Sequence, residues 1–104
     1  MAEVLAVLPD NRVLIKETIT GPASYTAGGF SHTISNVSVV DAILAASATG
    51  GYKVDAAAIT VSGNTLTIPV YYYDYDAAAD GAAIEVPDGT DLSGITITVI
   101  AIAR

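Results

Sequence analysis

The segment 57–73, AAITVSGNTLTIPVYYY, restricts the fold more than any other stretch of the chain. Two runs rich in β-branched and aromatic residues lie on either side of the pair Gly63-Asn64. Two-residue turns of this kind have a backbone twist that suits antiparallel strands. The segment therefore predicts a β-hairpin in the middle of the chain.

Three further segments have the composition of strands, namely 12–20, 30–35 and 94–103. In the last of them, GITITVIAIA, the first half alternates polar and apolar residues, as a strand with one buried face does. The second half is apolar on both faces, which is expected where a strand is covered on both sides. We expect a covering layer on each face of this end.

The segment 37–48, VSVVDAILAASA, fits two interpretations. Ser38 could cap a helix, and the apolar residues that follow it lie on one helical face. The segment also fits a strand that runs into the turn at residues 49–52. The β pattern on both sides favours the strand.

The number of strands and the spacing of turns predict an all-β fold, a small antiparallel β-sandwich or jelly-roll-like barrel. The length of 104 residues indicates one domain. We assign residues 1–9 to an N-terminal arm and residues 10–104 to a single β-sandwich domain.

Charge and cysteine content restrict the possible functions. The chain has eleven acidic and four basic residues, a net charge of −7, and no cysteine. Disulfides, thiolate zinc sites and cysteine nucleophiles are excluded. The negative charge disfavours nucleic acid and anionic membranes as partners. No apolar run reaches the roughly 18 residues of a membrane span, and Glu3 stands where a signal peptide carries positive charge. We expect a soluble chain without a secretory signal.

The single histidine, His32, lies in a segment where residues alternate between two faces. His32 shares one face with Phe30 and Ile34, whereas Ser31 points to the other face. A Ser-His pair is therefore not formed here, and we expect a partly buried histidine with a structural role.

The acidic residues after the tyrosine run allow two kinds of site to be considered. A carboxylate pair could perform acid–base chemistry, and the loop DYDAAADG could hold a cation. Aspartates in such loops more often cap turns, and the loop matches a calcium-binding loop only in part. We predict no enzyme, no cofactor and no metal, while a cation bound adventitiously by the loop stays open. The candidates are Asp74, Asp76, Asp80, Glu85, Asp88 and Asp91.

The tyrosines of residues 71–75 divide between two faces if the strand continues from Thr65. Tyr72 then falls on the core face, and Tyr71, Tyr73 and Tyr75 on the other face together with Pro69. Tyrosine is enriched at interfaces because its ring is rigid and its tip is polar. Either another protein or a loop of the same chain covers this stripe.

Three segments together resemble small structural proteins encoded among the head genes of tailed double-stranded DNA viruses: SYTAGGF, VSVVDAILAASATGGY and EVPDGTDLSGITITVIAIAR. Matching positions are Tyr25, Gly28 and Gly29, then Val40, Asp41, Gly50, Gly51 and Tyr52, and finally Gly89 through Gly94. The order and spacing of these motifs carry the resemblance, which covers residues 23–104. The segment YYYDYDAAADGAA departs from the pattern. The resemblance implies a virion component on the capsid exterior.

The expected function is that of a capsid decoration or cement protein that performs no chemistry. Its partner would be the major capsid protein, and a homo-trimer or other homo-oligomer is expected. Two surfaces are candidates for contact: the tyrosine stripe, and an arm that adds to a neighbouring sheet edge through Val4, Leu5, Val7 and Leu8. Alternatives are a receptor- or glycan-binding module, in which the tyrosines stack on sugars, and a tail or neck protein.

Overall fold

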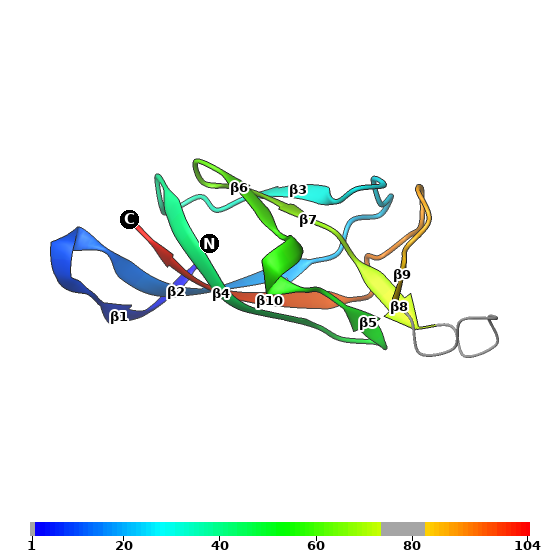
Figure 1. The fold of residues 1–104 in the computed structure, drawn as a ribbon, viewed down its shortest axis with the longest axis horizontal. Helices are drawn as coiled ribbons and strands as arrows, with labels where there is room; N and C mark the ends of the chain where they lie inside the picture. The colour runs from blue at the N-terminus through cyan, green and yellow to red at the C-terminus, as the bar shows by residue number, and fades with distance from the viewer. Residues whose placement is uncertain (1, 74–82) are drawn as a thin grey trace.

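A computed structural model describes residues 2–73 and 83–104, which form an all-β chain of antiparallel strands (Figure 1). The predicted all-β, antiparallel class is thereby confirmed. No helix in these two ranges is long and apolar enough to cross a membrane. The strands are β1 (Glu3–Val7), β2 (Val13–Thr20), β3 (Phe30–Thr33), β4 (Val40–Ala48), β5 (Tyr52–Lys53), β6 (Thr60–Ser62), β7 (Thr65–Ile68), β8 (Tyr71–Tyr73), β9 (Ala83–Glu85) and β10 (Thr96–Ala103), with short 3₁₀ turns η1 (Pro9–Asn11) and η2 (Ala56–Ala58).

The largest sheet has four strands in the order β1-β2-β10-β4. Its two central strands, β2 and β10, pair over eight residues each, from Thr96 opposite Thr20 to Ala103 opposite Val13. Alternation decides which side chains are buried, because successive residues of a strand point to opposite faces. The buried set on these two strands is Ile15, Glu17, Ile19, Ile97, Val99, Ala101 and Ala103.

The segment that fits both a helix and a strand is the strand β4. Its pairing with β10 shifts register in two places, between Ile100 and Ala101 and between Ile102 and Ala103. Bulges of this kind bend a strand and place an extra residue in it. The extra residues are Leu44 and Asp41, which have no opposite partner on β10.

The second sheet has the order β3-β7-β6 and contains the predicted hairpin. Gly63 has a φ of 60°, a left-handed conformation that glycine adopts without a steric penalty. Asn64 uses its side-chain amide to donate to the carbonyls of Ile34 and Val37, at 2.9 and 3.0 Å. The turn thus also holds the segment that follows β3.

The third sheet, β5-β8-β9, corrects one expectation about the tyrosine run. The strand expected to continue from Thr65 through Tyr73 ends at Ile68, and Pro69 and Val70 lie between β7 and β8. Proline has no N–H for a sheet ladder. Pro69 is buried, and the next N–H, of Val70, donates to the Tyr25 hydroxyl at 3.1 Å. The chain therefore changes sheets at this point.

The N-terminal segment is paired within its own chain. Residues 3–7 form β1, which runs antiparallel to β2 at the edge of the large sheet. Two hydrogen bonds fix its start, since Ala2 N–H donates to Asn36 Oδ1 at 2.9 Å and Asn36 Nδ2 donates to the Ala2 carbonyl at 3.0 Å. Residues 3–7 of the segment assigned to an N-terminal arm are thus an edge strand of the large sheet.

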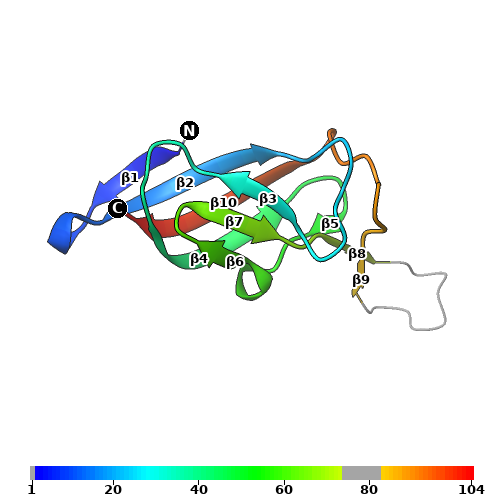
Figure 2. The same cartoon turned by 90° about the horizontal axis from the view of Figure 1, so that it is seen from above.

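The core lies between two layers. The sheet β3-β7-β6 lies over one face of the four-stranded sheet (Figure 1), and buried side chains of both sheets meet there. Seen from above, β1 extends beyond the area that β3, β7 and β6 cover (Figure 2). The two faces of the large sheet are thus unequal, and we call the face away from β3-β7-β6 the outer face.

Candidate functional site

The outer face of the large sheet has a straight line of apolar side chains across all four strands. Ala6 lies opposite Leu14, Leu14 opposite Ile102, and Ile102 opposite Ala42. Directly opposite residues of antiparallel strands point to the same face. These four residues, which we call the apolar row, lie on the outer face because the adjacent strand residues Ile15 and Ala101 are buried in the core.

Polarity increases along the outer face away from the apolar row. The next line across the sheet is mixed, with Glu3, Lys16, Ile100 and Ala45 opposite one another in turn. The line beyond it contains only hydroxyl side chains, those of Thr18, Thr98 and Ser47. The end of the sheet that holds the apolar row therefore has the character of a contact surface, and the other end that of a solvated surface.

The structure corrects the expectation that both faces of β10 are covered. The inward residues of its second half are fully buried, whereas Ile100 and Ile102 on the outer face are half-buried. None of the strands in residues 2–73 and 83–104 lies against the outer face (Figure 1). In the sequence, this surface is indicated by the second half of β10, which is apolar on both faces.

The candidate contact residues of the N-terminal segment are on the surface of the molecule. Val4, Leu5 and Val7 are 49%, 44% and 81% exposed, and Leu8 is half-buried. Val4 lies opposite Ile15 and Val7 opposite Val13, so both point to the inner side, where no strand of the described second layer reaches them (Figure 2). Leu5 is the extra residue of a bulge. Burying such side chains in a contact is favourable.

The charges near this edge cancel one another. Arg12, Lys16 and Arg104 are three of the four basic residues of the chain. They share this end of the molecule with Glu3 and Asp10 of the β1–β2 hairpin and with Asp41, which pairs with Arg104 at 3.4 Å. Three bases thus balance three acids. The net charge of −7 belongs to the rest of the sequence.

The structure describes part of the tyrosine stripe, and its contact with a partner stays a prediction. Tyr71 is half-buried, Tyr73 lies in β8, and Tyr75 is outside the described residues. Tyr72 packs against the core, as predicted for the core face. It lies opposite Tyr52 of β5, a cross-strand aromatic pair that the sequence did not reveal.

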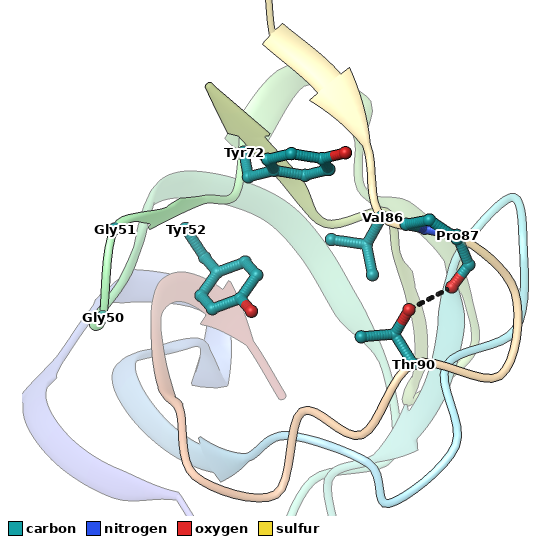
Figure 3. A pocket seen from close by; sticks show the side chains of 7 residues that line it. All are labelled: Gly50, Gly51, Tyr52, Tyr72, Val86, Pro87 and Thr90. Atoms are coloured by element: carbon teal, nitrogen blue, oxygen red, sulfur yellow. Dashed lines mark hydrogen bonds between the residues drawn. The ribbon is translucent and has the colours of Figure 1, made fainter. Parts of the chain in front are cut away.

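Tyr52 and Tyr72 form one wall of a pocket of about 440 Å³ (Figure 3). Val86, Pro87 and Thr90 form the opposite wall, and the Thr90 hydroxyl donates to the Pro87 carbonyl at 2.7 Å. Gly50 and Gly51 complete the lining, which among the described residues contains aromatic rings and hydroxyls and no charged side chain. Such a lining suits a small neutral ring.

Tyr25 joins two segments that are distant in sequence. Its buried hydroxyl donates to Glu85 Oε2 at 2.8 Å and accepts from the Val70 N–H. Glu85 Oε2 also accepts from the Gly28 N–H at 2.7 Å. Burial raises the pKa of Tyr25 to about 12, and the neighbouring Glu85 carboxylate adds to this increase. The network joins the segments around Gly28, Val70 and Glu85 at one end of the fold, which we call the loop end.

The same two segments are joined along their backbones. The Tyr25 N–H donates to the Thr90 carbonyl at 2.8 Å, and the Gly89 N–H donates to the Tyr25 carbonyl at 2.7 Å. Gly29 has a φ of 128°, and a Cβ there would lie 2.8 Å from Thr67 Cγ2. Tyr25, Gly29 and Gly89 therefore have structural roles in this chain.

His32 is half-buried and lies between the layers. Its Nε2 is 2.6 Å from Oε2 of Glu17, a buried residue of β2. Ser31 is exposed on the opposite face, as the alternation predicts. A carboxylate in a core needs a hydrogen-bonded or charged neighbour. The contact therefore gives His32 a structural explanation; the partner, Glu17, was not anticipated from sequence.

Two acidic residues of the loops accept hydrogen bonds, Asp88 from a distant segment and Asp91 from its own turn. Asp88 accepts from the Ala27 N–H, and Asp91 accepts from the N–H and hydroxyl of Ser93, which lowers the Asp91 pKa. Asp74, Asp76 and Asp80 lie outside the described residues. Within the described ranges, no group of three or more metal-binding side chains is assembled.

No protein family, curated protein or solved structure matches this chain.

Proposed function

We propose that this chain is a non-enzymatic structural protein of a virion, a decoration protein that attaches to the outside of the major capsid shell. The observation that carries the proposal is the edge strand β1, in which all five residues are exposed and three are large and apolar. The segments that resemble virus head proteins supply the identity of the partner. The protein would stabilise the shell by binding across it, since a ligand that binds the assembled state favours that state.

The geometry of β1 suits contact with another chain. A strand at a sheet edge presents backbone groups to which a second strand can bond. The bond between Ala2 and Asn36 holds the strand in place before binding, which reduces the entropy lost on association. Because Leu5 lies at a bulge, the ladder is short, and side chains would provide most of the contact.

Attachment to capsid shells tests the proposal. Shells assembled from the major capsid protein of the same genome are mixed with the chain and sedimented, and the bound fraction is measured. Val7→Lys should weaken attachment at least about tenfold, because the exposed valine would otherwise be buried in the contact. The matched control is Val61→Lys, an exposed valine of β6, which should bind as the wild type does.

Two results would contradict this assignment. One is that the wild-type chain does not sediment with shells. The other is that Val7→Lys and Val61→Lys bind equally well. If a density map of the whole particle places the chain in the tail or neck, the partner is a tail or neck protein instead.

The second candidate function is a glycan- or receptor-binding module on the virion surface. The pocket between Tyr52 and Tyr72 favours it, since its aromatic and hydroxyl lining suits a neutral sugar ring. A glycan array with the wild-type chain would show binding that Tyr52→Ala removes. Tyr71→Ala, which alters a tyrosine outside the pocket lining, is the control and should leave binding intact.

A further inference from the structure

The outer face of the large sheet is an uncovered surface with apolar side chains, separate from the surface proposed for β1. Val4 and Val7 point to the inner side of the sheet, whereas the apolar row points to the outer side. The two surfaces can therefore be occupied at the same time. A contact on the outer face does not depend on the proposed attachment to a capsid.

We propose that a second copy of this chain covers the outer face, with the two four-stranded sheets packed face to face about a two-fold axis. In such a dimer each copy offers the same patch, so the surface must be complementary to itself. The apolar row with Ile100 and Ala45 meets this requirement, because apolar side chains can pack against their own kind. Leu44, 53% exposed at its bulge, adds to the apolar area at the β4 edge.

The distribution of charge favours contact between two copies at the outer face over contact at other surfaces of the molecule. The apolar part of the face holds one acidic and one basic side chain, Glu3 and Lys16, in the same line across the sheet. The pair Asp41 and Arg104 at the β4 and β10 ends is also neutral. The rest of the sequence has nine acidic residues and two basic residues, Arg12 and Lys53, so other parts of two copies repel each other.

The size of the face limits the area that the dimer can bury. β10 has eight residues and the sheet has four strands. At about 3.3 Å per residue and about 4.8 Å between strands, the face measures about 26 by 19 Å, or about 500 Å² per copy. Two copies would bury about 1,000 Å², the lower limit for a specific interface. We therefore expect a dimer with a Kd in the micromolar range, which assembles as concentration rises.

Analytical ultracentrifugation of the full chain over a range of concentrations tests the dimer. The wild type should show a reversible monomer–dimer equilibrium. Ile102→Lys should raise the Kd at least about tenfold, since it puts a charge into the apolar row. Thr60→Lys is the matched control, an exposed threonine of β6 in the other sheet, and should change the Kd by no more than about threefold. Both variants reduce the net negative charge equally, so overall repulsion cannot explain a difference between them.

Ala45→Lys guards against a folding defect, because Ala45 is exposed and its substitution leaves the core intact. It should also weaken the dimer, and the near-ultraviolet circular dichroism of the tyrosines should stay that of the wild type. Sodium chloride should strengthen the wild-type dimer, because salt screens the repulsion between two acidic chains.

Three results would overturn the proposal. The first is a monomer at every concentration that stays in solution. The second is a dimer that Val7→Lys disrupts while Ile102→Lys and Ala45→Lys do not, which would place the contact at β1. The third is a dimer that salt dissociates, which would show that ion pairs rather than the apolar face hold it together. Since no capsid is present, these results do not depend on whether the proposed function holds.

Discussion

The loop end and the β1 end of this molecule differ in how far their side chains are satisfied by contacts within the chain. At the loop end, Tyr25, Glu85 and the turn at Gly89 satisfy one another through hydrogen bonds within the chain. At the β1 end, apolar side chains stay exposed on an edge strand and on the outer face. Groups bonded within the chain contribute to folding, and groups left uncovered are available for partners. We therefore expect substitutions at the loop end to change stability and those at the β1 end to change assembly.

The largest expected effect is at the loop end. Tyr25→Phe removes a buried hydroxyl and leaves the Val70 N–H without its acceptor. A buried polar group that loses its partner costs about 1–3 kcal/mol, and the bond to Glu85 is lost as well. We expect the free energy of unfolding to fall by about 2–4 kcal/mol in urea denaturation. Tyr71→Phe, at a half-buried tyrosine, is the control. An equal loss of unfolding free energy in this variant would mean that the Tyr25 hydrogen bonds contribute no more to stability than another tyrosine hydroxyl does.

Alkaline pH should weaken the same network. The pKa of Tyr25 is raised from 10.0 to about 12 in the folded state. Between these values the unfolded chain releases the proton and the folded chain keeps it, so stability falls as pH rises. The advantage of the wild type over Tyr25→Phe should be constant below the lower value and shrink by about 2–3 kcal/mol up to the higher one. Urea unfolding of both proteins at several pH values measures this; a constant difference would contradict it.

The smallest effect is expected at the β1 end. Arg104→Ala removes the contact with Asp41, which is 3.4 Å long and in which the arginine is largely exposed. Exposed ion pairs contribute between about 0 and 1 kcal/mol. Thermal unfolding should therefore show a stability close to that of the wild type. A loss as large as that of Tyr25→Phe would break the contrast between the two ends.

Local patterns were sufficient to predict several elements. Gly63-Asn64 predicted the hairpin because the turn type depends on two adjacent residues. Alternation in 94–103 predicted β10 and its buried face for the same local reason. Val4, Leu5 and Val7 are exposed, although their strand pairs with β2 of the same chain. Their contact with another protein stays a prediction.

Other features depended on contacts between distant residues. Tyr25 and Glu85 are sixty positions apart, and no local pattern joins them. Pro69 was assigned to the outward face, yet it is buried where the chain leaves one sheet for another. The buried carboxylate of Glu17 was likewise missed, because its neighbour His32 lies on the facing sheet.

The amino-acid sequence by itself determined that this chain is all-β and antiparallel, and that the end of β10 is apolar on both sides. These properties follow from the alternation of side chains along a strand and from two-residue turns. Both patterns can be recognised within a short segment of sequence. Only the tertiary structure decided which of the two apolar sides is covered. That outcome depends on where β3, β7 and β6 come to lie, and they cover the inner face and leave the outer face and β1 open.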